Sequence, residues 1–259
     1  MTSVPVPPST FERPRVTPGA LTDSTVLVVG GSSGFGRQVV VDAATAGARL
    51  IVVGRDAAKA HAVAHEASGV GGKATAFALD ATTEDGLERL IEIAGDVDHV
   101  VSTLGGAMGG GFLEAPFDEI RAAVDDKVFD NLRLARALAP HLNDGGSMTF
   151  TAGTGGAPHT ASGAYLGNQA IATMVRGLAL ELAPRGIRVN AVAPTWTATP
   201  LWRDHDEAEV RETQRQMAAT IPLGRTGEVG EVAEAYLFLL TCGFITGQTI
   251  AVDGGMNLL

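Results

Sequence analysis

Short apolar runs alternate with amphipathic stretches along most of the chain. Most of the runs are rich in valine, isoleucine and leucine, and all have the length of β-strands. They cover residues 25–29, 49–53, 73–79, 98–104, 147–152, 187–193 and 248–252. Apolar positions recur at helical spacing in residues 36–48, 56–68, 84–94, 117–142, 164–182 and 228–240. The pattern therefore predicts seven strands separated by helices.

Uniformly apolar strands divided by helices are typical of a parallel sheet covered by helices on both faces. Nothing in the sequence marks a linker or a repeat. We therefore predict one α/β domain over residues 21–259, with a Rossmann-like, doubly wound, seven-stranded parallel sheet. Residues 195–221 are expected to form a lid over the substrate. Residues 1–20, rich in proline, serine and threonine, are expected to form a flexible arm.

Composition limits the classes of partner. The chain has 259 residues, 45% of them hydrophobic and 19% charged, which suffices for a buried core. Its formal net charge of −10 argues against nucleic acid or an anionic membrane as the main partner. No apolar run is long enough to cross a bilayer, and residues 1–20 lack the apolar segment of a signal peptide. The single cysteine, Cys242, permits no intrachain disulfide, so we expect a cytoplasmic protein. We predict no metal site.

A glycine-rich turn, VVGGSSGFG, links the first predicted strand to the first predicted helix. Gly30, Gly34 and Gly36 permit positive φ angles, close approach of the backbone to a pyrophosphate, and tight packing of helix on strand. The helix N-terminus adds unpaired N–H groups and a positive dipole end. In this strand–turn–helix context an ordinary flexible turn is the weaker interpretation. The predicted phosphate-binding residues are Gly30, Ser32, Ser33, Gly34, Phe35 and Gly36.

The end of the second strand indicates which dinucleotide is preferred. An acidic side chain there would accept hydrogen bonds from the adenosine ribose of NAD. The chain instead has Gly54 at that position, followed by Arg55. A guanidinium at this edge suits the 2′-phosphate of NADP, so we predict NADP(H) in preference to NAD(H). The alternative is that Arg55 is a solvated surface arginine.

These motifs resemble the short-chain dehydrogenase/reductase family, in its single-domain form and with the layout of 3-oxoacyl-carrier-protein reductases. The resemblance runs from about Val26 to Gly255. Its most specific parts are GGSSGFG, LALELAPRGIRVNAVAPTWTATPL and the tail IPLGRTGEVGEVAEAYLFLLTCGFITGQTIAVDGG. The resemblance implies a Rossmann-type fold, a nicotinamide cofactor, and a homo-oligomer that is a tetramer or a dimer.

The resemblance also implies further cofactor contacts. Asp80 matches the family's adenine-contacting aspartate, although its context, DATTEDG, also resembles a helix N-cap. Pro194 and Thr199 match the segment that borders the nicotinamide and hydrogen-bonds its amide. The family's fourth strand normally ends with two asparagines, an alanine and a glycine. This chain reads STLG there, so that Gly105 alone is kept.

The catalytic positions depart from the family's pattern. Tyr165 matches the tyrosine that passes a proton to or from the substrate oxygen, but the lysine expected four residues later is Gln169. Gln169 can hydrogen-bond a ribose hydroxyl, yet it supplies no positive charge to lower the pKa of the tyrosine. Counting back from Tyr165 puts Ala152 where the family has a substrate-binding serine. Either Thr151 or Thr154 could replace that hydroxyl, or both could simply close the strand and open the turn.

Lys127 stands where the family has an asparagine on its long helix, as judged from the shared segment APHL, residues 139–142. Asn131, one turn later on the same face, is the rival for that position. Lys127 flanks the apolar stripe of its helix, where a lysine without a partner is uncommon. We hypothesise that its ammonium enters the active site from the opposite wall and replaces the charge missing at Gln169. The alternative is that it extends to solvent or pairs with a neighbouring aspartate.

The sequence favours an NADP(H)-dependent oxidoreductase that interconverts a carbonyl and an alcohol. Tyr165 would donate the proton, supported by Lys127 and a nearby threonine. Glycine, methionine, phenylalanine and tryptophan in the predicted pocket and lid suit a small, neutral, partly apolar substrate. Because three catalytic positions differ, two rivals stay open. One is a cofactor-binding but non-redox enzyme, such as a cyclase, isomerase or dehydratase, and the other is a catalytically silent subunit.

Overall fold

The computed structural model describes residues 17–106, 109–202 and 205–259. Most of the predicted arm, residues 1–16, and residues 203–204 of the predicted lid lie outside that range. Residues 17–20 form an exposed turn, after which Leu21 is buried in the core. In the described part of the chain, no helix is long and apolar enough to span a membrane. The same part contains no group of three or more His, Cys, Asp or Glu side chains that could hold a metal ion.

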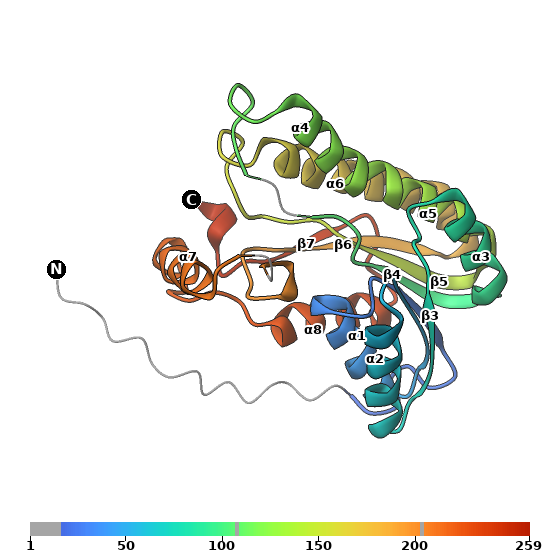
Figure 1. Cartoon of the computed structure of the whole chain (residues 1–259). Helices are drawn as coiled ribbons and strands as arrows, with labels where there is room; N and C mark the ends of the chain where they lie inside the picture. Colours follow the sequence, from blue (N-terminus) through green and yellow to red (C-terminus); the bar gives the residue numbers. More distant parts are fainter. Residues whose placement is uncertain (1–16, 107–108, 203–204) are drawn as a thin grey trace.

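Seven parallel strands form one sheet in the order β3-β2-β1-β4-β5-β6-β7 (Figure 1). They are β1 (Thr25–Val29), β2 (Arg49–Gly54), β3 (Lys73–Ala78), β4 (Val97–Ser102), β5 (Leu142–Thr151), β6 (Arg188–Pro194) and β7 (Thr249–Val252). The predicted doubly wound, seven-stranded sheet is thereby confirmed. The direction of winding reverses between β1 and β4, and such a reversal leaves a crevice at the carboxyl ends of the strands.

Helices cover both faces of the sheet (Figure 1). One face carries α1 (Gly34–Thr45), α2 (Ala57–Gly69) and α8 (Val229–Thr241). The other carries α3 (Glu84–Ala94), α4 (Phe117–Val124), α5 (Asp130–Leu138) and α6 (Ser162–Leu182). A further helix, α7 (Glu207–Thr220), lies within the predicted lid. The apolar pattern missed α7 because its sequence is mostly polar and none of its residues is buried.

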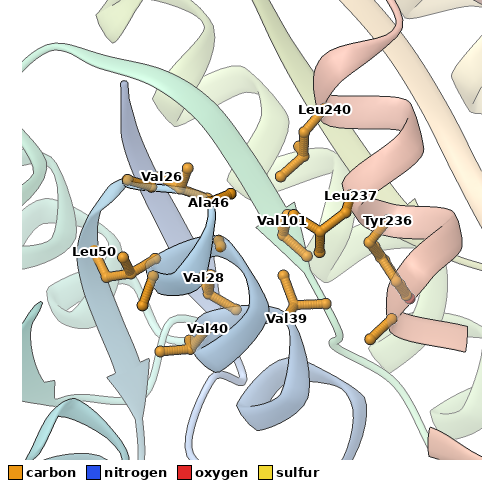
Figure 2. Close-up of a cluster of buried hydrophobic side chains, with 14 of the residues drawn as sticks. Val26, Val28, Val39, Val40, Ala46, Leu50, Val101, Tyr236, Leu237 and Leu240 are labelled. Atoms are coloured by element: carbon orange, nitrogen blue, oxygen red, sulfur yellow. The ribbon is translucent and has the colours of Figure 1, made fainter. Parts of the chain in front are cut away.

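Two apolar cores lie on the two faces of the sheet. The core between the sheet and the α1/α8 layer includes Val28, Val39, Val101, Tyr236 and Leu237 (Figure 2). The core on the opposite face includes Leu134, Leu138, Phe150, Ile171 and Val175. Because both faces are packed, the strand ends are held rigidly, and the side chains that follow them are placed at fixed positions along one edge.

The long helix predicted over residues 117–142 is interrupted. A π-helical turn, η1 (Asp125–Phe129), separates α4 from α5, and a 3₁₀ helix, η2 (Ala139–His141), follows α5. In the interruption the N–H of Asp130 bonds to the carbonyl of Asp125, five residues back. The side-chain amide of Asn131 donates to the Lys127 carbonyl at 2.7 Å. Turns of this kind are frequent at functional sites, and this one contains the buried Lys127.

Candidate active site

A cavity of about 720 Å³ opens at the carboxyl ends of the strands, where the winding reverses between β1 and β4. Open α/β sheets bind their ligands at this place. Most of the predicted site residues line it: Gly30, Ser32, Ser33, Gly34, Phe35, Arg55, Asp80, Gly105, Lys127, Thr151 and Pro194. Four predicted residues are not part of its lining: Gly36, Tyr165, Gln169 and Thr199.

The turn between β1 and α1 has the geometry of a phosphate cradle. Gly30 has a φ of +81°, and a Cβ there would lie 2.2 Å from Oγ1 of Thr103. Gly36 packs beneath the turn, where a Cβ would lie 2.3 Å from the Gly30 carbonyl oxygen. Ser33 begins α1 without a side-chain hydrogen bond to the helix, so its side chain leaves the first amides free. These amides suit a pyrophosphate, and the residues therefore fit the dinucleotide that the sequence predicts.

The part of the cavity where the sequence predicts the adenosine lies after β2 and β3. A Cβ on Gly54 would lie 2.4 Å from Oγ of Ser32, so an acidic side chain there would require Ser32 to move. Arg55 is exposed and lines the cavity. The Asp80 carboxylate accepts hydrogen bonds from the hydroxyl and the N–H of Thr82, at 2.7 and 3.0 Å, and these bonds lower its pKa. Asp80 thus has the turn role that its context suggests, and it also lines the cavity.

The segment after β6 differs in part from the expectation. Pro194 lines the cavity, whereas Thr199 packs beside Gly34, where a Cβ would lie 3.7 Å from Cβ of Thr199. Thr195 and Thr197 are the threonines that line the cavity, and the Thr197 hydroxyl donates to the Thr195 carbonyl at 3.1 Å. The sequence TWTATP repeats threonine at every second position, so it carries no signal that distinguishes the cavity-facing residues.

The helix α6 presents Ala164 and Asn168 to the cavity in place of Tyr165 and Gln169. Successive residues of an α-helix differ in direction by about 100°. Ala164 and Asn168 therefore share one face, and Tyr165 and Gln169 share another that is rotated away from the cavity. Tyr165 is half-buried outside the cavity lining, and Gln169 is exposed. The geometry therefore does not support Tyr165 as the proton donor or Gln169 as a ribose contact.

The phase of α6 also changes which residue stands at the serine position. The spacing that selects Ala152 is counted from Tyr165, and the same spacing counted from Ala164 selects Thr151. Thr151 is buried at the end of β5 and lines the cavity. Thr154, the other candidate, is not part of the lining.

Lys127 points into the cavity from the π-helical turn. It is buried, and its Nζ donates to the Thr151 carbonyl at 3.2 Å. A Cβ on Gly105 would lie 3.0 Å from Nζ, and a Cβ on Gly167 would lie 3.0 Å from Cγ of the lysine, so two glycines make room for it. Burial lowers the pKa of Lys127 to about 8. Asn131, its rival, is fully buried behind it and holds the Lys127 carbonyl instead of facing the cavity.

One wall of the cavity is aromatic and apolar. Trp196 and Trp202 stack with their ring centroids 5.6 Å apart, and Leu201 and Met217 also line the cavity. Three lining residues carry a buried polar atom that has no partner in the described part of the chain: Asn168 (Oδ1), Thr195 (Oγ1) and Trp196 (Nε1). Buried polar atoms are nearly always paired in folded proteins, so these atoms fit a site for a polar ligand or water.

Comparison with known proteins gives consistent matches over nearly the whole chain. A family model described as enoyl-(acyl carrier protein) reductase matches residues 29–257. The 7alpha-hydroxysteroid dehydrogenase of Escherichia coli K12 is 29% identical over 239 residues, 88% of this chain and 92% of that protein. The L-rhamnose 1-dehydrogenase (NAD(P)(+)) of Azotobacter vinelandii is 31% identical over 254 residues, 91% and 97% of the two chains. A solved 3-oxoacyl-[acyl-carrier protein] reductase from Brucella melitensis superposes with a TM-score of 0.82 at 27% identity, covering 100% of this chain and 99% of that one.

Proposed function

The chain belongs to the short-chain dehydrogenase/reductase family, and on that premise we propose that it is an NADP(H)-dependent oxidoreductase with an atypical active site. It interconverts a carbonyl and an alcohol on a small, neutral, partly apolar compound. The observation that carries the proposal is that a phosphate cradle, an arginine and a buried lysine meet in one cavity. A bound nicotinamide supplies or accepts the hydride, and the residues of the chain handle the proton.

The preference for NADP(H) rests on the end of β2. Residue 54 is glycine, and Ser32 fills the space that a Cβ would need, so this position offers no carboxylate to accept hydrogen bonds from a ribose. Arg55 is exposed at the same edge and is free to form a charge-assisted contact with a 2′-phosphate. Asp80 and Thr82 border the cavity nearby and are suited to contact the adenosine.

Lys127 is the residue we assign to the proton. With a pKa of about 8 its amine is mostly protonated at neutral pH, yet it gives up and regains a proton at little cost. An ammonium carries three donors, and one of them bonds to the Thr151 carbonyl. The other two can reach a substrate oxygen in the cavity. The charge that the family takes from α6 would then come from η1.

The substrate class follows from the cavity wall. Trp196, Trp202, Leu201 and Met217 offer a flat, apolar surface, which suits a ring or a short aliphatic chain. Asp126, beside Lys127, also lines the cavity and opposes an anionic substrate. The unpaired polar atoms of Asn168, Thr195 and Trp196 are suited to the polar part of such a compound.

The same proposal includes assembly into a homo-oligomer and a cytoplasmic location. Large apolar side chains are exposed on α4, η1 and α6: Phe117, Phe129, Leu166 and Leu180. Exposed apolar side chains gathered on neighbouring helices are typical of surfaces that another subunit covers. Light scattering coupled to size-exclusion chromatography measures the assembly directly, and a monomer at micromolar concentration would contradict it.

The deciding experiment combines cofactor binding with turnover. Both tryptophans of the chain line the cavity, so energy transfer from indole to bound NADPH reports binding. NADPH oxidation is then followed over a panel of cyclic and linear ketones and aldehydes, with the wild type and with Lys127→Met. Lys59→Met, at an exposed lysine on α2, is the matched control. Turnover that Lys127→Met abolishes and Lys59→Met retains supports the proposal, whereas unchanged turnover in Lys127→Met contradicts the role of the amine.

A second function, a cofactor-binding enzyme without net hydride transfer, has one specific observation in its favour. The face of α6 that meets the cavity carries Ala164 and Asn168, neither of which can donate a proton as a phenol does. NADPH bound tightly, with no oxidation by any panel carbonyl and no NADP reduction by the matching alcohols, would favour this second function.

A further inference from the structure

A tyrosine that takes no part in the proposed reaction reaches Thr151 from the other face of the sheet. Tyr236 lies on α8, fully buried in the core that it shares with Val39 and Val101 (Figure 2). Its hydroxyl oxygen is 2.5 Å from Oγ1 of Thr151, which lines the cavity. The phenol therefore touches the end of β5 from one layer of helices, while Lys127 touches it from the other.

The direction of that hydrogen bond follows from counting donors. A threonine hydroxyl has one proton, and the proton of Thr151 is donated to the carbonyl of Ser102 at 2.8 Å. The proton between the two hydroxyls must then come from Tyr236. Burial raises the pKa of Tyr236 above its usual range, which keeps the phenol in the protonated form that donates. Thr151 consequently has no proton left for a substrate carbonyl, and its role is not that of the family's serine.

A closed set of hydrogen bonds connects Thr151 to both ends of Lys127. Nζ donates to the Thr151 carbonyl at 3.2 Å. At the other end, Asn131 donates to the Lys127 carbonyl at 2.7 Å and accepts from the Ser102 hydroxyl at 2.6 Å. Ser102 also receives the Thr151 hydroxyl at its own carbonyl, at 2.8 Å. Tyr236 adds a hydrogen bond to this set, because its hydroxyl contacts Thr151 from the face of the sheet that α8 covers.

We propose that Tyr236 is a positioning residue that holds the Lys127 amine in the cavity, acting through Thr151 from the opposite face of the sheet. The catalytic importance of this role rests on the proposed function, whereas the hydrogen bonds themselves need neither substrate nor cofactor. With the phenol in place, Thr151 is bound on both sides and its carbonyl stays where the ammonium needs an acceptor. Without it, one of the two bonds that orient the Thr151 side chain is lost.

Among the described residues, four other charged side chains line the cavity and could affect the pKa of the Lys127 amine. The charged side chains that line the cavity with Lys127 are Asp126 on its own turn, Asp130 at the start of α5, Asp80 after β3, and Arg55 after β2. The cavity-facing residues of α6, Ala164 and Asn168, carry no charge. Burial is the cause of the lowered pKa of Lys127. The Thr151 carbonyl is an acceptor for the charged form of the amine, so we expect weakening of that bond to lower the pKa further.

The test titrates Lys127 directly. The chain has three lysines, at positions 59, 73 and 127, so labelling with ε-¹³C-lysine yields three side-chain signals that Lys127→Met assigns. We expect the Lys127 signal to titrate near pH 8 in the wild type, and at least about half a pH unit lower in Tyr236→Phe, about a threefold loss of proton affinity. Tyr165→Phe is the matched control, because it removes the other phenol of the chain from a position outside the cavity.

Two further variants keep the test decisive if Tyr236→Phe does not fold. Thr151→Val removes the same hydrogen bond from the other side and should lower the titration midpoint of Lys127 equally. Thr151→Ser keeps the hydroxyl and should keep the wild-type midpoint. A midpoint unchanged in both Tyr236→Phe and Thr151→Val, or shifted equally in Tyr165→Phe, would overturn the positioning role. Because the titration is made on the free protein, a failure of the proposed oxidoreductase activity leaves this result unaffected.

Discussion

Nζ of Lys127 donates to the carbonyl oxygen of Thr151 across 3.2 Å, and this bond joins the interrupted helix to the end of β5. The lysine of the family resemblance would stand on α6, four residues after a tyrosine. In this chain the cavity face of α6 is uncharged, and the cation enters from η1. Lys127 and Asn168, which lies on the cavity face of α6, line the same cavity, so a positive charge can enter that cavity from either helix.

Replacing Lys127 with methionine should stabilise the fold at neutral pH. The folded lysine has a pKa of about 8 against 10.5 in the unfolded chain, so burial of the charge costs about 3 kcal/mol below pH 8. The cost declines between pH 8 and 10.5, because over that range the unfolded chain binds the proton that the folded chain has lost. Urea unfolding should show Lys127→Met more stable by up to about 3 kcal/mol at pH 7 and by far less above pH 10.5.

The control for this gain is Lys59→Met, whose lysine is exposed on α2 and should change stability little at any pH. A variant Lys127→Met that is less stable than the wild type at pH 7 would mean that the amine is better solvated than its burial indicates. Gain of stability with loss of turnover is the pattern expected of a functional residue held at a cost to the fold.

The pH dependence of carbonyl reduction should follow the ammonium of Lys127. Reduction consumes the proton of the amine, so kcat/KM should stay level below about pH 8 and fall about tenfold per unit above it. Alcohol oxidation requires the neutral amine, so its kcat/KM should rise with pH up to about pH 8 and then stay level. The profile is measured with any reducible carbonyl of the panel, and with NADPH at saturation. A reduction rate that rises through pH 8 would exclude the amine as the acid.

Tyr165 should be dispensable for turnover, in contrast to its neighbour on α6. We expect Tyr165→Phe to keep kcat/KM within about twofold of the wild type, since the ring is not part of the cavity lining. Ala164→Leu adds three carbons on the cavity side and should weaken substrate binding at least tenfold. Steady-state kinetics of the two variants shows which face of α6 is turned towards the cavity. A hundredfold loss in Tyr165→Phe alone would return that tyrosine to the active site.

The seven strands and the glycine turn could be predicted because their signals are local. Runs of β-branched residues predict strands from a few neighbouring residues. The spacing of Gly30, Gly34 and Gly36 between a strand and a helix likewise predicts a phosphate-binding turn. Lys127 could be singled out for a similar reason, because a lysine beside an apolar stripe is unusual without a partner.

The phase of α6 could not be settled by the tyrosine alone. Polar and apolar residues are mixed around Tyr165, with Leu166 beside it and Asn168 and Gln169 one turn later, so the local pattern does not mark the cavity face. A usable signal lay further along, where Gly167, Ile171, Val175 and Ala179 form the buried stripe at four-residue spacing. The contact between Thr151 and Tyr236, 85 residues apart, has no counterpart in any local pattern, because the packing of α8 against the sheet creates it.

Arg55 should set the preference between the two dinucleotides. Arg55→Ala removes the guanidinium from the rim of the cavity, and we expect NADPH to bind at least about tenfold more weakly while NADH binding stays within about twofold. The difference arises because the two cofactors differ only in the 2′-phosphate, which the guanidinium is placed to contact. Energy transfer from the two cavity tryptophans measures both dissociation constants without any substrate. Arg37→Ala is the matched control, since its guanidinium pairs with Glu66 at 2.6 Å and does not line the cavity. Equal weakening of both cofactors in Arg55→Ala would show a general electrostatic effect, and no weakening at all would leave Arg55 as a surface residue and NADP(H) without its main support.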